Sequence, residues 1–227
     1  MRHAEMEVCG DGPHPPNSMP KKREMNRILT FGELRDVLYG RWYSENVIDA
    51  YMGMLYSRRV GMRNKTNVPS LAILGCNFYP KFVAEGFEGI VQFLRNVVTI
   101  SADLVLMPVC MEPSKHWILG VIDGQAMAVT IYCSLRLRLP EVRRNIQAFM
   151  VADNAARNNA AFRLSDWTFN DAGQGPQQTN GYDSGMFVCL AAEQLTRGMQ
   201  PTKKKTKTDI LRPQHVVELL ACELFYK

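Results

Sequence analysis

The sequence predicts a single α+β domain in which helices near both ends of the chain surround a central series of antiparallel strands. Residues 44–59 and 210–225 carry apolar side chains at helical spacing. Residues 103–132 instead contain three short apolar runs separated by turn residues. The chain has 227 residues, 46% of them apolar and 22% charged, so it can bury a full core without metal or disulfide support.

The first part of the chain divides into a tail and the beginning of the domain. Residues 1–26 are rich in proline and end near a small basic cluster, so we expect a flexible tail before a domain that spans 27–227. Ser44 can cap the first helix, and Glu45 lies in its positively polarised first turn. Residues 71–78 are expected to form a strand, and residues 88–98 a second amphipathic helix.

The rest of the chain continues this alternation of strands and helices. Gly124-Gln125 fits a tight turn between two strands, and Pro140 suits the first turn of a helix. The expected elements are strands at 103–109, 116–123 and 126–132, a helix at 140–158, a strand at 162–169, and helices at 184–195 and 210–225. A polar loop at 170–183 precedes the apolar helix that begins at Ser184.

Composition excludes several classes of protein. The net charge of +5 is too small for a dedicated nucleic-acid binder, so nucleic acid is not an expected partner. No apolar run approaches the ~18 residues of a membrane span, so no membrane association is expected. A nucleic-acid adaptor remains a remote alternative, based on the basic residues Lys203, Lys204, Lys205, Lys207, Arg136, Arg138, Arg143 and Arg144.

The cysteines and histidines indicate a reducing compartment and no metal. No pair of cysteines has CxxC spacing, no secretory signal is visible, and several thiols lie in apolar runs. We therefore expect an intracellular protein of the nucleus or cytoplasm, with neither a metal nor another cofactor. The six cysteines are Cys9, Cys76, Cys110, Cys133, Cys189 and Cys222, and the four histidines are His3, His14, His116 and His215.

The polar loop before Ser184 is the most unusual segment. It reads PQQTNGYDSG over residues 176–185 and leads into an apolar helix. A nucleophile at a helix N-terminus benefits from the dipole and from free N–H groups that can hold an oxyanion. Gln178 could add a side-chain donor, and Gly185 would allow a substrate to come close. On these residues alone, a hydrolase-like elbow and an ordinary turn with a helix cap both remain open.

Three segments together resemble the Ulp/SENP cysteine proteases, which remove SUMO or related ubiquitin-like proteins. The loop is similar to the family pattern PQQxNGYDCG, and HWILGVID at 116–123 resembles the catalytic-histidine strand. WYSENVI at 42–48 is similar to the segment that opens the family's domain. The resemblance implies a papain-like cysteine-protease fold of the Ulp/SENP, adenain-like type, and cleavage after a C-terminal Gly-Gly.

The resemblance also implies a role for each matching residue. His116 would be the general base, Gln178 the oxyanion donor, and Trp117 an aromatic wall over the partner's Gly-Gly tail. Trp42 would form a second wall, and Glu45 would pair with a basic residue of the ubiquitin-like protein. For both tryptophans, simple core packing is the alternative.

Two substitutions fall at the centre of this implied mechanism. Ser184 stands where the family has the nucleophilic cysteine, and Cys133, 17 residues after His116, stands where it has the triad aspartate. A serine needs a strong base oriented by a carboxylate, whereas a cysteine thiol ionises more readily. Asp123 is only a weak candidate for a substitute carboxylate. The chain as written should therefore be inactive or weakly active.

Three explanations of these substitutions remain open. The chain could be a naturally degenerate pseudoprotease that binds a ubiquitin-like protein or acts as a scaffold. Ser184 could instead be a deliberate inactivating substitution, although that would not explain Cys133. An unconventional active enzyme is the third possibility.

Overall fold

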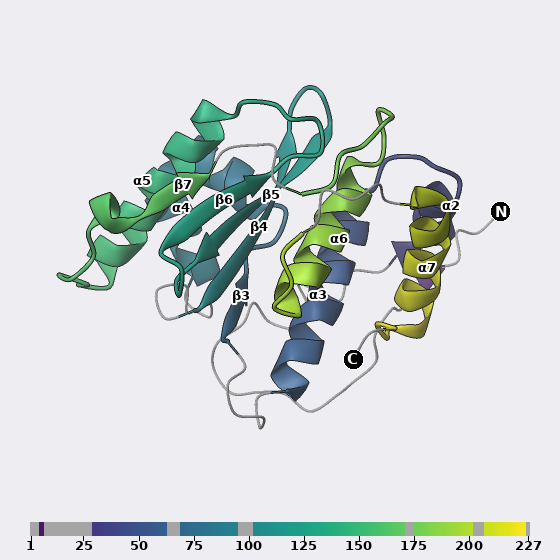
Figure 1. Ribbon diagram of the computed structural model, residues 1–227, viewed down its shortest axis with the longest axis horizontal. Helices are drawn as coiled ribbons and strands as arrows, with labels where there is room; N and C mark the ends of the chain where they lie inside the picture. The colour runs from purple at the N-terminus through teal and green to yellow at the C-terminus, as the bar shows by residue number, and fades with distance from the viewer. Residues whose placement is uncertain are drawn as a thin grey trace.

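The structure is a computed structural model that describes residues 5–6, 29–62, 69–94, 102–170, 175–201 and 207–225. Its centre is a five-stranded sheet in the order β3-β4-β5-β6-β7, with helices on both faces (Figure 1). The elements are β1 (Glu5–Met6), β2 (Leu29–Thr30), α2 (Phe31–Leu38), α3 (Glu45–Gly61), β3 (Leu71–Ile73), α4 (Phe78–Leu94), β4 (Leu104–Met111), β5 (His116–Asp123), β6 (Ala128–Tyr132), α5 (Pro140–Ala156), the 3-10 turn η1 (Leu164–Asp166), β7 (Thr168–Asn170), α6 (Ser184–Thr196) and α7 (Thr208–Ala221).

Each face of the sheet is covered by its own helices. Helices α4 and α5 lie on one face and α3 and α6 on the other, with α2 and α7 packed farther out beside α3 and α6 (Figure 1). The buried apolar residues accordingly form two separate clusters. Trp117 and Leu119 belong to the cluster on the α3/α6 side, whereas Ile118 belongs to the cluster on the α4/α5 side. Alternate residues of β5 therefore contribute to different cores, as strand geometry requires.

The expected antiparallel strands are confirmed at the centre of the sheet, but the expectation is wrong at both edges. Strands β4, β5 and β6 do pair antiparallel. However, β3 runs parallel to β4, and β7 runs parallel to β6. The chain passes through α4 between β3 and β4 and through α5 between β6 and β7. A long helical crossover of this kind returns the chain to the same end of the sheet, which makes the next strand parallel.

Several expected elements are confirmed with their boundaries. Strand β5 has the expected limits, and helix α6 begins at Ser184. Helix α3 begins after Ser44, whose Oγ accepts a hydrogen bond from the Val47 N–H at 3.3 Å. Helix α5 begins at Pro140, where the missing N–H costs nothing because the first turn has no carbonyl partner for it.

The strand expected at 71–78 is much shorter, and the helix expected after it begins earlier. Strand β3 ends at Ile73, and the chain turns where the Phe78 N–H donates to the Gly75 carbonyl. Helix α4 then begins at Phe78, ten residues before the expected start. Gly86, with φ of +67°, interrupts the helix, and the expected helix corresponds to the part after this kink. Residues 95–98 of the expected helix lie outside the described residues.

Two further elements differ from expectation. The strand expected at 162–169 is a 3-10 turn, η1, followed by the three-residue strand β7. Helix α2 was not expected, although its sequence carries a capping box. The Thr30 hydroxyl accepts from the Glu33 N–H at 3.2 Å, and Glu33 accepts in return from the Thr30 N–H at 2.9 Å.

The ends and the basic loop lie largely outside the described residues. Within the expected tail, Glu5 and Met6 form β1, which pairs antiparallel with β2. Residues 1–4 and 7–26 of that tail are not described, nor are residues 203–206 of the basic loop. No helix among the described residues is long and apolar enough to cross a membrane.

Candidate active site

The four residues expected to form the site come from four places in the fold. His116 is the first residue of β5, and Ser184 is the first residue of α6. Cys133 directly follows β6, and Gln178 lies in the loop before α6. Strand β6 pairs with β5 and α6 packs on β5, so these positions meet at one end of the sheet.

His116 contacts the residue that stands at the triad-aspartate position. Its Nε2 lies 3.3 Å from Cys133 Sγ, and both side chains are buried. Burial lowers the pKa of His116, because the imidazolium loses hydration. The expected pairing of positions 116 and 133 is therefore present, but the imidazole faces a thiol rather than a carboxylate.

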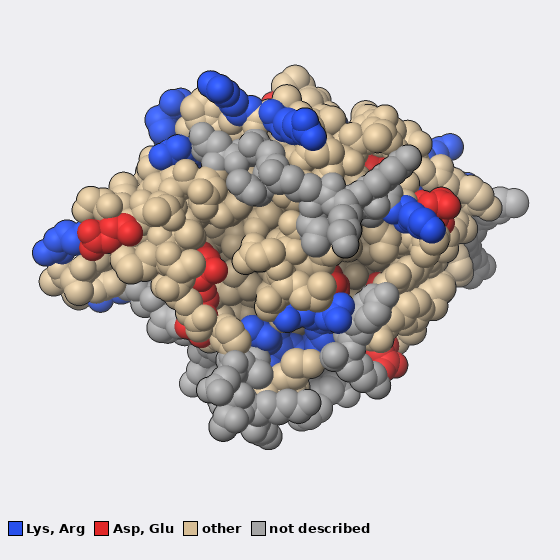
Figure 2. Space-filling view, viewed as in Figure 1, with Lys and Arg blue, Asp and Glu red and all other residues tan. Residues whose placement is uncertain are grey.

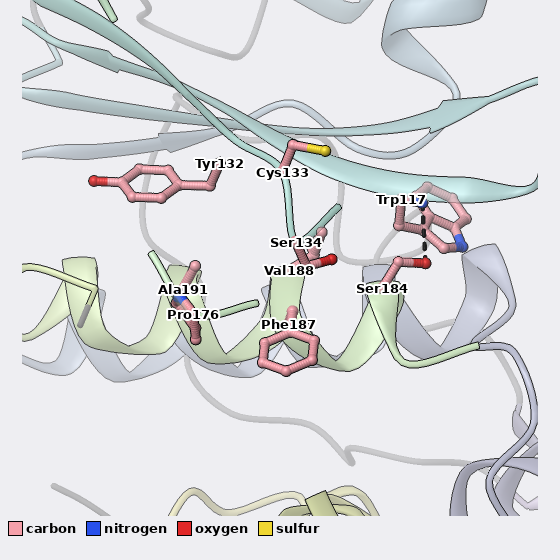
Figure 3. A pocket seen from close by; sticks show the side chains of 9 residues that line it. All are labelled: Trp117, Tyr132, Cys133, Ser134, Pro176, Ser184, Phe187, Val188 and Ala191. Carbon is pink, nitrogen blue, oxygen red and sulfur yellow. Dashed lines mark hydrogen bonds between the residues drawn. The ribbon is translucent and has the colours of Figure 1, made fainter. Parts of the chain in front are cut away.

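Ser184 is held against the strand that carries His116. Its Oγ accepts a hydrogen bond from the backbone N–H of Trp117 at 3.2 Å, and the residue is 1% exposed. Figure 3 shows this bond joining α6 to β5, with the Cys133 thiol on the sheet above α6. Positions 116, 133 and 184 are thus gathered in one region through direct contacts of neighbouring residues.

Gln178 is tied to the strand end beside Cys133. Its side-chain Oε1 accepts from the Ser134 hydroxyl at 2.5 Å, and its backbone N–H donates to the Ser134 carbonyl at 3.0 Å. Its Nε2 donates to the Asn180 carbonyl at 2.6 Å, which uses one of the two N–H groups of the amide. The expected oxyanion donor therefore has a fixed orientation within the loop.

A small pocket lies between the sheet and α6 (Figure 3). It has room for about one water molecule. Its lining includes both substituted positions, together with apolar side chains of α6. The lining residues are Trp117, Tyr132, Cys133, Ser134, Pro176, Ser184, Phe187, Val188 and Ala191.

The two tryptophans expected to form walls over the partner's Gly-Gly tail have different environments. Trp42 is 54% exposed, and its Nε1–H donates to the Gly181 carbonyl at 2.8 Å, beside the loop that leads to Ser184. Trp117 is 4% exposed and belongs to the α3/α6-side core, with its Nε1–H donating to the Tyr43 carbonyl at 3.0 Å. Trp42 therefore presents an open surface, whereas Trp117 also packs in the core.

Two acidic residues and one glycine were singled out from the sequence. Glu45 is exposed at the start of α3. Asp123 lies at the opposite end of β5 from His116, and its Oδ1 accepts from the N–H groups of Gln125 and Ala126. Asp123 therefore caps a turn and is not a substitute carboxylate. At Gly185 a Cβ would lie 2.6 Å from Tyr43 Cβ, so glycine is required by the packing of α6 rather than only by access to the site.

Sequence reasoning missed an ion pair directly beside Ser184. The Arg212 Nε and Nη2 donate to Asp183 Oδ1 at 2.8 and 2.6 Å, and both residues are buried. The available signal was an arginine within the apolar run of α7 and an aspartate just before an apolar helix, because buried charges are usually paired.

Other kinds of site receive no support from the described residues. Nowhere in the described ranges do three His, Cys, Asp or Glu side chains gather as a metal site would require. On the face drawn in Figure 2, Lys and Arg side chains form separate groups rather than one continuous stripe, and some of these groups have Asp or Glu beside them. Of the arginines considered for nucleic acid, Arg136, Arg138 and Arg144 are exposed, but exposure is normal for arginine and does not by itself indicate a nucleic-acid site.

Comparison with protein families gives one match over most of the domain. The family model of the Ulp1 protease family, C-terminal catalytic domain, matches residues 41–221. Among curated proteins, sentrin-specific protease 2 of Homo sapiens is 24% identical over 222 residues, covering 97% of this chain and 37% of the relative. Sentrin-specific protease of Caenorhabditis elegans is 25% identical over 183 residues, covering 81% of this chain and 26% of the relative. The chain thus spans about a third of the length of these relatives or less.

Solved structures share the fold. The catalytic domain of the Chaetomium thermophilum Ulp1-like SUMO protease superposes with a TM-score of 0.75 at 20% identity, covering 98% of this chain and 93% of that one. The Ulp1 protease domain in complex with Smt3, the yeast orthologue of SUMO, gives a TM-score of 0.69 at 19% identity, covering 92% and 89%. These likenesses establish the papain-like α+β fold in a single domain.

Proposed function

Because the chain belongs to the Ulp1 protease family, we propose that it binds a ubiquitin-like protein by that partner's C-terminal Gly-Gly tail. We also propose that the chain as written has little or no hydrolytic activity. The names of its relatives support a ubiquitin-like partner, since they are sentrin-specific and SUMO proteases. The hydrolysis of the peptide or isopeptide bond after Gly-Gly would be the ancestral reaction of this site.

The contact between His116 and Cys133 is the observation that carries the proposal. A carboxylate only accepts hydrogen bonds, so an aspartate at this position keeps a proton on Nε2 and leaves Nδ1 free to act as a base. A thiol can donate to Nε2 instead, and the neutral ring then carries its proton on Nδ1. A neutral thiol also provides no negative charge to stabilise the imidazolium, so base catalysis by His116 would be weak.

The environment of Ser184 also predicts weak catalysis. Its hydroxyl is far less acidic than a thiol and must lose its proton to a base as it attacks a carbonyl. Burial lowers the pKa of His116, which makes the imidazole a poorer proton acceptor. The Trp117 N–H already occupies one lone pair of the Ser184 oxygen. A weak base and a weak nucleophile together predict slow chemistry.

The surface around the site has features that binding would need even without cleavage. Trp42 is exposed beside Gly181, and Glu45 is exposed at the start of α3, where each could contact a partner. Aromatic surfaces of this kind lose little entropy on binding and often dominate interfaces. A naturally degenerate binder or scaffold therefore explains Cys133 and Ser184 together.

Titration with ubiquitin-like proteins tests the proposal. SUMO, NEDD8-like and ubiquitin samples would be titrated into the protein by calorimetry, each with and without its Gly-Gly tail. We expect one of them to bind in a tail-dependent way and to remain uncleaved after prolonged incubation. Cleavage at a rate typical of an enzyme, or no binding by any of the three at high micromolar concentration, would contradict the proposal.

A reducing intracellular location, nuclear or cytoplasmic, completes the proposal. The cysteines of the described part of the chain are free rather than paired in disulfides: Cys76, Cys110, Cys133, Cys189 and Cys222. Free buried thiols are typical of compartments where glutathione keeps them reduced.

A further inference from the structure

Asp183 stands at the N-cap position of α6, yet its side chain does not cap the helix. Aspartate at this position usually accepts from the second or third N–H of the helix. Here Oδ1 accepts from Arg212, and Oδ2 accepts from Asn180 Nδ2 at 2.7 Å. The carboxylate of Asp183 is thus turned away from the first amides of α6, which belong to Ser184, Gly185 and Met186.

Arg212 is fixed by further contacts that leave it one orientation. Its Nη1 donates to the Val37 carbonyl at 2.7 Å, and its Nη2 donates to the Tyr182 carbonyl at 3.3 Å. The guanidinium carbon also lies 5.2 and 5.5 Å from the ring centres of Tyr43 and Tyr182. The residue is 4% exposed. Arg212 therefore connects α7, the end of α2 and the loop that leads to Ser184.

We propose that Arg212 is a positioning residue that draws the Asp183 carboxylate away from α6 and so keeps this anion off the helix amides beside Ser184, which would hold the carbonyl or carboxylate group of a bound tail. This inference rests on the proposed function, because it supposes that the tail ends at position 184. Without Arg212, the carboxylate has a ready alternative, since a rotation of the Asp183 side chain allows it to cap α6. An anion at that cap would repel an oxyanion or a tail carboxylate at the same amides.

A thiol introduced at position 184 reports on this electrostatic environment without any partner protein. Thiols at open helix N-termini ionise at lower pH than free thiols, and a neighbouring carboxylate opposes this effect. The pH dependence of iodoacetamide alkylation would therefore be measured on the Ser184→Cys protein, by mass spectrometry of the peptide that carries position 184. Among the described residues, the charged and titratable groups near it include His116, Asp183, Arg212 and Tyr43, which packs against Gly185, together with the thiol of Cys133.

Three variants in the Ser184→Cys background distinguish positioning from simple stabilisation. Arg212→Gln should raise the midpoint of the alkylation profile by about 1 pH unit, because the carboxylate is released. Adding Asp183→Asn to Arg212→Gln should return the midpoint toward that of the parent, because no carboxylate is left to cap the helix as an anion. Arg212→Lys keeps the charge and should shift the midpoint less than Arg212→Gln does.

The Arg58–Glu193 pair provides a matched control. Its side chains are 10% and 8% exposed, its N–O distance is 3.1 Å, and it joins α3 to the other end of α6. Arg58→Gln in the same background should lower the melting temperature but leave the alkylation profile in place. The proposal is wrong if Arg212→Gln leaves the midpoint unchanged, if Arg58→Gln shifts it equally, or if the Ser184→Cys parent reacts no more readily than a free thiol. Because iodoacetamide needs no partner, failure to bind ubiquitin-like proteins would overturn the proposed function alone.

Discussion

His116 Nε2 and Cys133 Sγ lie 3.3 Å apart at the end of the sheet, where a neutral thiol takes the place of an orienting anion. The chain as written should therefore not react with a ubiquitin-like vinyl-sulfone probe. Ser184→Cys should regain slow labelling. Ser184→Cys with Cys133→Asp should label faster by at least about 10-fold, because the carboxylate orients and stabilises the imidazolium. The mass shift of the labelled protein measures each rate.

Removal of the base provides the control for this series. Adding His116→Ala to the double variant should return labelling to a slow background rate. Labelling of the unaltered chain at Ser184 would show that the loss of activity was wrongly assigned. If the double variant stays unreactive while still folded, the surface around the site can no longer hold the probe's Gly-Gly tail against position 184.

Trp42 and Trp117 should affect binding and stability differently. Trp42→Ala should weaken binding of the ubiquitin-like protein by about 2 kcal/mol, because an exposed aromatic surface is lost, with little change in unfolding. Trp117→Ala should lower the free energy of unfolding by about 3–5 kcal/mol, because Trp117 packs in the core. Calorimetric titration and urea denaturation measure the two effects. If Trp42→Ala weakened the binding of a partner without its Gly-Gly tail by the same amount, Trp42 would contact the partner outside the tail.

Glu45 should influence the rate at which a partner associates. Glu45→Lys should reduce the association rate and change its salt dependence, because an exposed charge at the rim of an interface steers approach more than it anchors the complex. Glu88 is exposed on α4, across the sheet from the site, so Glu88→Lys changes the net charge equally and is the control. Stopped-flow measurements at several salt concentrations that gave the same result for both variants would exclude a local role for Glu45.

His215 should make the protein less stable in mild acid. Burial lowers the pKa of this histidine to about 3, below its ordinary value near 6.5. The unfolded chain then binds a proton that the folded chain does not, so stability is complete above about pH 6.5 and falls as the pH decreases. Between pH 7 and pH 5 the free energy of unfolding should fall by about 1–2 kcal/mol more in the unaltered protein than in His215→Gln.

Urea denaturation at both pH values measures this difference. Glutamine at position 215 can still pair with the Tyr43 hydroxyl, which lies 3.1 Å from His215 Nδ1. The variant therefore removes the titration while it keeps a hydrogen-bonding side chain. An identical pH dependence in both proteins would mean that His215 does not account for the acid sensitivity.

Residues within or next to an element were sufficient to predict where several helices and strands begin and end. Pro140 marks the start of α5, Ser44 caps α3, and the apolar run from His116 fills β5. Such local signals failed where a turn lay inside an apolar run, as at Gly75 between Ile73 and Phe78, because a single glycine there also fits a continuing strand. The parallel edges of the sheet depend on crossovers through helices, and periodicity within a strand contains no information about its direction.

The candidate site could likewise be predicted only in part from the sequence. The resemblance to the family identified His116 and Ser184 through the motifs that contain them, and Cys133 through its place 17 residues after His116. Arg212 could not be found in this way, since it reaches Asp183 from 29 residues away and only the fold brings them together. Core packing of Trp117 was an open alternative from the sequence, but its hydrogen bond to the Tyr43 carbonyl, 74 residues distant, could not be predicted.

The division of the interior into two cores makes the candidate site sensitive to changes far from it. Cys133 packs in the core on the α4/α5 side, whereas Trp117, which holds Ser184, packs in the core on the α3/α6 side. The relative positions of residues 133, 116 and 184 thus depend on how α4 and α5 pack on one face of the sheet and α3 and α6 on the other. A volume change in either layer can displace Ser184 relative to His116 while every site residue keeps its identity. Drift in packing alone could therefore have silenced such a site before, or without, any substitution of the residues that perform the chemistry.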